Sequence, residues 1–285
     1  MYWSNYHSHC TYCDGRSSME DFVRFAIAKG LKKYGFSSHA PLPFLTKWTM
    51  PEDDFEDYEK EFYRLKDKYK NEIELFIGLE VDYIQGCSDI KNEFFTNKKL
   101  DYSIGSIHYL DKISKHEYWS IDGDFETFEK GLNLLFGGDI QSAAERFFEI
   151  TRNMIDKGDF DMVGHLDKIT YHGLKIRNFD IESKWFYRLV TDVLELIKTK
   201  QMILEINTKS LNEHGITFPH QQFYPLINEM DIPIVVNSDC HYPTNVTAGF
   251  LPTFKALKNA GFKTMHQLFE NEWQPVEFDE GGLRF

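Results

Sequence analysis

The chain has 285 residues, of which 42% are hydrophobic and 27% charged, so it can bury a sizeable core and is not disordered. A formal net charge of −13 disfavours any long nucleic acid as a partner, because like charges repel. The sequence has no run of 18 apolar residues and no basic segment followed by an apolar run at its start, so we expect neither a membrane partner nor a secretory signal.

The cysteines favour a cytoplasmic protein. There are four of them, Cys10, Cys13, Cys87 and Cys240, and in a chain of this length they do not form a recognisable disulfide framework. Cys10 and Cys13 form a single C-x-x-C pair, whereas a structural zinc site normally needs a second pair at similar spacing. The oligomeric state stays open.

Strand and helix patterns alternate along the chain. Short β-branched or apolar runs predict seven strands, at residues 2–7, 34–38, 75–81, 102–107, 161–164, 202–206 and 232–237. Amphipathic segments with helical spacing predict helices at residues 19–29, 55–69, 143–155, 185–198 and 253–260. Such alternation indicates a parallel sheet, one strand short of a full eight-stranded barrel. An open doubly wound sheet is the alternative, but no Gly-rich loop follows the first strand.

Polar residues with metal-binding side chains lie at the ends of the predicted strands. They are His7 and His9, His39, Glu80, His108, His165, Glu205 and Asn207, and Asp239 and His241. In a barrel the carboxyl ends of all strands open onto one face, where the active site lies in enzymes of this architecture. We therefore expect these side chains to meet at one rim.

The residue types favour a metal centre that acts on phosphate. Imidazole and carboxylate ligands suit Zn, Mn or Fe, and Glu80 could bridge two ions. Two ions about 3.5–4 Å apart can hold a bridging hydroxide and clamp a phosphoryl group. A single histidine is usually a surface or core residue, but six of the eleven histidines follow the strand-end pattern. The other five are expected to be structural or exposed: His116, His172, His214, His220 and His266. Asp14 is either a further ligand or a turn residue.

These motifs resemble the polymerase-and-histidinol-phosphatase (PHP) superfamily, and more closely its histidinol-phosphate phosphatases. The resemblance covers nearly the whole chain and is specific in combination. It rests on His7-Ser8-His9, Asp14-Gly15, His39-Ala40-Pro41, Gly78-Leu79-Glu80, Ser106-Ile107-His108, Gly164-His165, Glu205-Ile206-Asn207 and Ser238-Asp239-Cys240-His241. One departure is Ser38, where many relatives have Asp, and we expect it to alter the support of a ligand rather than abolish binding.

The resemblance implies an α/β fold, a distorted (β/α)7 barrel of the PHP type, with three divalent ions (Zn, Mn or Fe). We expect a single domain over residues 1–285 with a helical insert at about 111–158. One ion would take His7, His9, Glu80 and Asp239. A second would share Glu80 and add His108 and His165. A third would use Asp14, His39 and His241.

The resemblance also implies a metal-dependent phosphomonoesterase that hydrolyses L-histidinol phosphate to L-histidinol and phosphate, in histidine biosynthesis, by a metal-bound hydroxide. Catalytic roles are expected for Glu80, Asp239 and His241. Predicted contacts to this small phosphorylated substrate are Arg16 and Arg177 to the phosphate, Asp122 or Glu205 to a cationic amine, and Asn207. The alternatives are a PHP-type phosphoesterase acting on a nucleotide or phosphotyrosine, and a non-catalytic metal-dependent interaction module.

Overall fold

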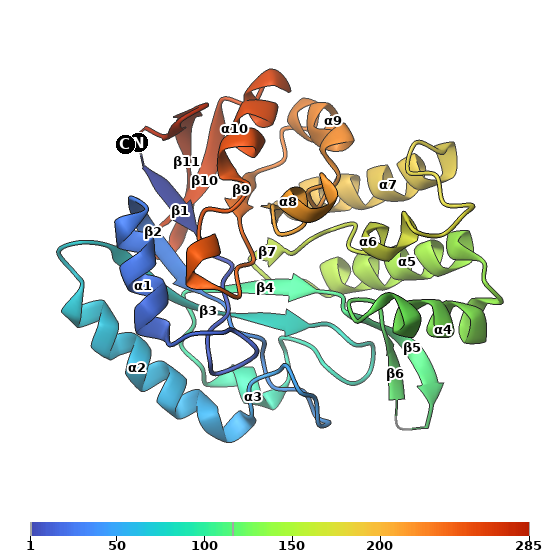
Figure 1. Cartoon of the computed structure of the whole chain (residues 1–285), viewed down its shortest axis with the longest axis horizontal. Helices are drawn as coiled ribbons and strands as arrows, with labels where there is room; N and C mark the ends of the chain where they lie inside the picture. The colour runs from blue at the N-terminus through green and yellow to red at the C-terminus, as the bar shows by residue number, and fades with distance from the viewer. Residues whose placement is uncertain (1, 116, 285) are drawn as a thin grey trace.

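Seven parallel strands form a nearly closed barrel in the computed structural model, which describes residues 2–115 and 117–284 (Figure 1). His116 lies outside these residues. The strands pair in the order β1-β2-β3-β4-β7-β8-β9, and each neighbouring pair is parallel. Their bounds are β1 Trp3–Asn5, β2 Leu31–Phe36, β3 Glu74–Asp82, β4 Tyr102–Ser106, β7 Met162–Val163, β8 Ile203–Asn207 and β9 Ile234–Asn237. The seven predicted strands and the predicted barrel are confirmed.

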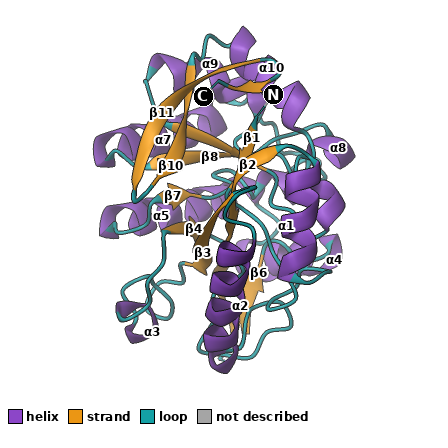
Figure 2. Cartoon of the chain, turned by 90° about the vertical axis from the view of Figure 1, so that its left-hand side faces the viewer, coloured by secondary structure: helices purple, strands orange, loops and turns teal. Residues whose placement is uncertain are grey.

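Helices surround the barrel on its outer side (Figure 2). They are α1 Met19–Ala28, α2 Phe55–Lys68, α3 Glu93–Thr96, α4 Phe125–Phe136, α5 Ile140–Lys157, α6 Thr170–Gly173, α7 Lys184–Lys200, α8 Leu211–His214, α9 Tyr224–Glu229 and α10 Phe250–Asn259, with short 3-10 turns at Glu52–Asp54, Gln221–Phe223 and Pro243–Asn245. Local capping sets several of their starts: Ser18 accepts from the N–H of Asp21 at α1, and Ser183 from that of Phe186 at α7. Each described helix is too short or too polar to span a bilayer.

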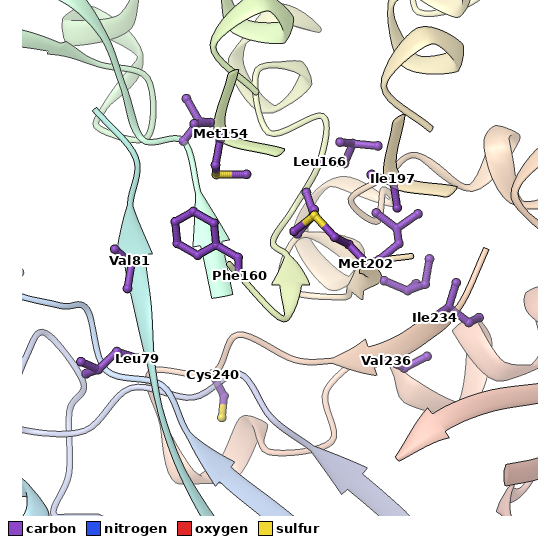
Figure 3. Close-up of a cluster of buried hydrophobic side chains, with 14 of the residues drawn as sticks. Leu79, Val81, Met154, Phe160, Leu166, Ile197, Met202, Ile234, Val236 and Cys240 are labelled. Atoms are coloured by element: carbon purple, nitrogen blue, oxygen red, sulfur yellow. The ribbon is translucent and has the colours of Figure 1, made fainter. Parts of the chain in front are cut away.

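The side chains of β3 alternate between the two sides of the barrel wall. Leu79 and Val81 point outwards into the layer between strands and helices, where Met154 of α5 and Ile197 of α7 also lie (Figure 3). Glu80, between them, is 1% exposed and reaches the cluster of histidines described below. The period of two along a strand therefore delivers one carboxylate to the site while its neighbours anchor the strand in the core.

The barrel interior is apolar at one end. It is filled by Tyr6, Phe76, Tyr102, Ile104, Met162, Ile203, Val235 and Leu268. A C-terminal hairpin of β10 (Thr264–Phe269) and β11 (Glu272–Asp279) supplies Leu268, and Trp273 of β11 packs edge-on against Tyr6 with ring centroids 5.0 Å apart. A short β12 (Gly282–Leu283) completes this small sheet. The hairpin thus closes the amino end of the barrel, and the polar strand ends are left at the other.

The first and last strands of the barrel meet along a seam without forming a regular ladder. A single parallel bridge joins Ser8 to Cys240, and the N–H of His9 donates to the Cys240 carbonyl at 3.0 Å. Side chains complete the seam: Asn5 Nδ2 donates to Ser238 Oγ at 2.8 Å. The segments that close the barrel are therefore the ones that carry His7, His9 and Asp239.

Two parts of the fold were not predicted from the sequence. Residues 111–158 hold the helices α4 and α5, but also most of an antiparallel hairpin, β5 Tyr109–Ser114 and β6 Glu117–Ser120. The hairpin β10–β11 was missed because Pro275, which cannot donate to a ladder, interrupts an otherwise strand-like pattern. Pro275 is tolerated where it pairs with His266, in a small sheet of three strands.

Candidate metal centre

Glu80 lies at the centre of five histidines. Its Oε2 is 3.1 Å from His7 Nε2, 3.4 Å from His9 Nε2 and 3.0 Å from His39 Nδ1. Its Oε1 is 2.9 Å from His165 Nε2 and 3.6 Å from His108 Nε2. These ligand atoms come from the ends of five different strands, which is the convergence that the strand-end pattern predicts.

Two further carboxylates extend the cluster on either side of His9. Asp239 Oδ1 is 3.2 Å from His9 Nε2 and 3.7 Å from His7 Nε2. Asp14 Oδ1 is 3.2 Å from His241 Nε2 and 3.8 Å from His39 Nε2. Eight of the nine predicted ligands form three overlapping groups: His9, Asp14, His39 and His241; His7, His9 and Asp239; and His39, Glu80 and His108. The ninth, His165, joins them through its contact with Glu80 Oε1.

The donor atoms fit divalent metal ions. In the described part of the chain, four buried atoms that face the cluster have no hydrogen-bond partner: His7 Nε2, His9 Nε2, Asp14 Oδ1 and His39 Nδ1. Leaving such atoms unpaired costs about 1–3 kcal/mol each. Lone pairs of imidazole and carboxylate at these spacings suit Zn, Mn or Fe. Each of the three groups contains a histidine with both ring nitrogens directed at carboxylates. The residues present thus match the group that the sequence predicts.

Backbone geometry at the strand ends is unusual in two places. Asp239 has φ 47° and His165 has φ 20°, both in the left-handed region that non-glycine residues rarely adopt. Each residue follows the last residue of its strand, Val163 of β7 or Asn237 of β9, by two positions. Such conformations cost about 1–3 kcal/mol and cluster at functional sites, where surrounding structure holds them. Here the turns redirect a ligand towards the barrel axis.

Glu205 and Asn207 lie behind the cluster rather than at its surface. Glu205 is fully buried, with Oε1 2.6 Å from His7 Nδ1 and Oε2 accepting from the His165 N–H at 2.8 Å. Asn207 Nδ2 donates to Glu205 Oε2 at 3.0 Å and to Asp239 Oδ2 at 3.1 Å. The predicted direct contacts of these two residues with substrate are therefore not favoured, since their polar atoms already orient ligands.

A second carboxylate supports His108 in the same way. Asp82 Oδ1 lies 2.9 Å from His108 Nδ1, which directs Nε2 of that ring towards Glu80. Ser106 adds a hydroxyl that donates to Glu80 Oε1 at 2.6 Å. Ser38, at the position where the sequence departs from many PHP proteins, is buried, and its hydroxyl lies 3.4 Å from Cys10 Sγ.

The two cysteines beside the centre are free thiols. Burial raises the pKa of the Cys10 thiol to about 11, so it stays protonated at neutral pH. Cys13 Sγ lies 3.6 Å from His9 Nδ1. This contact makes Cys13 a neighbour of a ligand, and a protonated thiol there is a weak hydrogen-bond partner rather than a nucleophile.

The carboxylates of the cluster are held ionised. Burial favours the neutral form of Glu80, but the charges of His7, His39 and His108 together outweigh it and hold its pKa well below the usual range. Burial is likewise outweighed at Asp239, whose pKa is kept well below normal by Lys209 and His7. Ionised carboxylates are the form that binds cations.

A pocket of about 220 Å³ opens onto the cluster. Its walls are Asp14, His39, Trp48, His108, Ser120, Asp122, Gly123, Lys209 and His241. Asp122 Oδ1 is 2.9 Å from Nζ of the buried Lys168, and Oδ2 is 3.8 Å from His108 Nε2. Asp122 is thus the one predicted substrate-binding residue that lines the pocket.

The two predicted phosphate partners do not line this pocket. Arg16 is exposed, although its backbone N–H donates to the His241 carbonyl at 2.8 Å. Arg177 is exposed in the loop between α6 and α7. Sequence reasoning missed Trp48 and Lys209, which do line it. Lys209 follows Asn207 by two residues, so the strand-end pattern could have found it, whereas the loop that carries Trp48 has no periodic signal.

The PHP domain model matches residues 5–209, and the chain therefore belongs to the PHP domain family. Among curated proteins, it is 27% identical over 257 residues to a histidinol-phosphatase of Bacillus subtilis, covering 84% of this chain and 94% of the relative. It is 26% identical over 275 residues to a probable histidinol-phosphatase of Schizosaccharomyces pombe, covering 91% and 87%.

A solved structure shows the same fold. The crystal structure of histidinol phosphate phosphatase from Lactococcus lactis, in complex with zinc, L-histidinol and phosphate, superposes with a TM-score of 0.75 at 18% identity. The match covers 96% of this chain and all of that one. Nearly the whole chain thus shares the fold of that structure.

Proposed function

We propose that this protein is a histidinol-phosphatase, a phosphoric monoester hydrolase that converts L-histidinol phosphate to L-histidinol and phosphate with three divalent metal ions. The observation that carries the proposal is the cluster of Glu80 with eight further candidate ligand side chains, opening into one small pocket. The curated relatives named histidinol-phosphatase support the substrate. A place in cytoplasmic histidine biosynthesis follows from that activity.

Three ligand sets would hold the ions. His7, His9 and Asp239 would take one, together with Glu80. His108 and His165 would take a second, also through Glu80. The Nδ1 of His39 faces this set, but a neutral imidazole offers a single lone pair, so His39 is counted with the third ion. Asp14, His241 and the Nε2 of His39 would take the third. Bound divalent ions lower the pKa of water, supply hydroxide near neutral pH and offset the charge of a phosphate.

The residues of the protein itself orient the metal ligands and select the substrate. Glu205 and Asp82 fix the orientation of His7 and His108 from behind. A pocket of about 220 Å³ suits a small monoester rather than a polymer. Burial raises the pKa of the Asp122 carboxyl, but the charges of Lys168 and His108 lower it by more, so its pKa lies below normal. A charged carboxylate would therefore meet the amine or imidazole of the substrate.

Phosphate release from a substrate panel tests the proposal. Purified protein is supplied in turn with Mn, Zn or Fe and offered L-histidinol phosphate, nucleotides, sugar phosphates and phosphotyrosine. We expect a strong preference for L-histidinol phosphate that chelator abolishes and that the Glu80→Ala variant, prepared identically, lacks. Preference for a nucleotide or phosphotyrosine would overturn the substrate, and silence with every metal would favour the non-catalytic interaction module.

A further inference from the structure

Lys209 is the one lysine or arginine among the described residues that line the pocket. The other charged walls are the carboxylates of Asp14 and Asp122 and the imidazoles of the centre. A phosphate monoester carries up to two negative charges into this space. The nearby Lys168 is buried and paired with Asp122, so it does not offer its ammonium to the pocket. Lys209 is therefore the side chain of the pocket wall that can offer an ammonium group to a phosphate.

The backbone at Lys209 is firmly anchored just beyond β8. Its N–H donates to Asn207 Oδ1 at 3.0 Å. Thr208 donates its N–H to the Asn237 carbonyl at 2.9 Å and its hydroxyl to the Ala248 carbonyl at 2.6 Å. The root of the lysine side chain is thus held against β9, and only its four-carbon stem has freedom to move.

The ammonium of Lys209 shares an oxygen with the metal-ligand set. Its Nζ is 3.1 Å from Asp239 Oδ1, the same oxygen that lies 3.2 Å from His9 Nε2 and belongs to the His7, His9 and Asp239 group. A divalent cation held by that group and the lysine ammonium would therefore compete for one oxygen. Like charges at such separations repel strongly where water is scarce.

A phosphate in the pocket would end the competition between the metal ion and the lysine ammonium for Asp239 Oδ1. Its oxygens offer the ammonium a new anionic partner on the open side, and the side chain of Lys209 is 36% exposed, so it has room to turn. Lysine acts on phosphate as a compact point charge on a flexible stem, which suits such an exchange. Arg16 and Arg177, which the sequence suggests for this task, do not line the pocket.

We propose that Lys209 binds the phosphate group of the substrate, exchanging Asp239 Oδ1 for a phosphate oxygen when the centre holds its ions. The inference rests on the proposed phosphomonoesterase activity and deepens it by naming the protein cation that receives the phosphate. It does not depend on which alcohol is esterified.

The test compares Lys209→Met and Lys209→Arg with Lys255→Met, which removes an exposed lysine of α10 that does not line the pocket. Inorganic phosphate is titrated calorimetrically into each Zn-loaded protein, and bound metal is counted by mass spectrometry. We expect Lys209→Met to bind phosphate roughly 10- to 100-fold more weakly, the range for loss of a charged hydrogen bond. Lys209→Arg should retain part of the affinity, and Lys255→Met all of it, with metal content equal in all three.

Kinetics with p-nitrophenyl phosphate adds a second readout. Lys209→Met should raise KM and the inhibition constant of phosphate together. Unchanged phosphate affinity with reduced metal content would show that Lys209 merely supports Asp239, and unchanged values of both would remove any role; either result overturns the inference. If the wild type ignores L-histidinol phosphate while phosphate binding still depends on Lys209, the proposed substrate fails and the assignment of Lys209 stands.

Discussion

The carboxylate of Glu205 lies 2.6 Å from Nδ1 of His7, and both side chains are fully buried. The short contact favours a proton on Nδ1 and directs Nε2 towards Glu80 and Asp239, where this nitrogen would be free to bind an ion once the ring is neutral. Glu205 is itself held by amide groups: Asn237 Nδ2 donates to Oε1 and Asn207 Nδ2 to Oε2, both at 3.0 Å. A carboxylate behind a histidine fixes the tautomer and raises the basicity of the ligand.

Glu205→Gln should lower metal affinity by about 10- to 100-fold, because loss of such a supporting carboxylate usually has this effect. Competition with a fluorescent zinc chelator measures it. Glu195→Gln, an exposed change on α7, is the matched control and should bind metal normally. Normal zinc affinity in Glu205→Gln, combined with a raised KM, would instead favour the direct substrate contact suggested by the sequence.

Glu80→Ala should lose at least one metal ion and nearly all activity, because both carboxylate oxygens of Glu80 lie within 3.6 Å of histidines from different ligand sets. Metal analysis by mass spectrometry and phosphate release provide the two measurements. Far-ultraviolet circular dichroism establishes that the variant is folded. A folded variant with full metal content would show that Glu80 is not a shared ligand.

Removal of metal should lower the thermal stability of the wild type. An ion present at about 100 times its Kd stabilises the folded state by about 2.7 kcal/mol, and here it would also satisfy the buried atoms of His7, His9, Asp14 and His39. Calorimetry before and after dialysis against chelator, and again after Zn is restored, measures the shift. An identical Tm in all three samples would contradict a metal site in the folded protein.

Gly131→Ala should destabilise the protein even though alanine is the better helix former. Gly131 lies in α4, and a Cβ there would come within 2.1 Å of Cδ1 of the fully buried Trp119. Helix propensity would contribute about 1 kcal/mol in favour of alanine, but overpacking costs typically about 1–3 kcal/mol. Urea unfolding measures the balance, with Asn133→Ala on the exposed side of α4 as control. Greater stability of Gly131→Ala would mean that Trp119 can move aside.

Glu20 should make a small, pH-dependent contribution to stability. Hydrogen bonds from Lys68, Arg64 and Tyr69 lower its pKa to about 2 in the folded protein, against about 4.3 in an unfolded chain. A depressed folded pKa stabilises above the unfolded value and loses that effect as the pH falls from about 4 towards 2. Glu20→Gln should therefore lower Tm at pH 7, by a modest amount because the ion pairs are partly exposed, and the gap should narrow below pH 4. A gap independent of pH would rule out the ion pairs as its cause.

The sequence was sufficient for the parts of the site that follow from strand geometry. Eight of the nine proposed ligands lie close to the end of a barrel strand, and parallel strands in a barrel present those ends together, so the strand pattern was enough to name these eight. Asp14, nine residues past the end of β1, was named from the resemblance to the PHP superfamily. The barrel itself follows from the alternation of strands, whose side-chain pattern repeats every 2 residues, with helices, whose pattern repeats every 3.6 residues.

The sequence did not predict the role of a residue when that role depends on how far behind the pocket the side chain lies. Glu205 and Asp239 both lie at strand ends, yet one lies behind the ligands and the other among them, and no periodicity separates the two cases. Arg16 adjoins the motif in sequence, but only its backbone reaches the site, at His241. Trp48 enters the pocket from a loop, and loop paths are set by contacts such as its ring N–H to the Tyr109 hydroxyl, at 3.2 Å.

The seam between the first and last strands also bears on the order of folding. Asn5 and Ser238 are 233 positions apart in sequence, so joining them restricts a very long loop and yields only a few hydrogen bonds in return. Bringing together residues so far apart in sequence costs chain entropy, and the interactions formed within local structure do not offset this cost. We therefore expect closure between Ser8 and Cys240 to come late, after the central strands have paired. Since the same segments carry His7, His9 and Asp239, the centre is assembled only when the chain has finished folding. An ion bound there would hold the first and last strands together and so slow the reopening of the completed barrel.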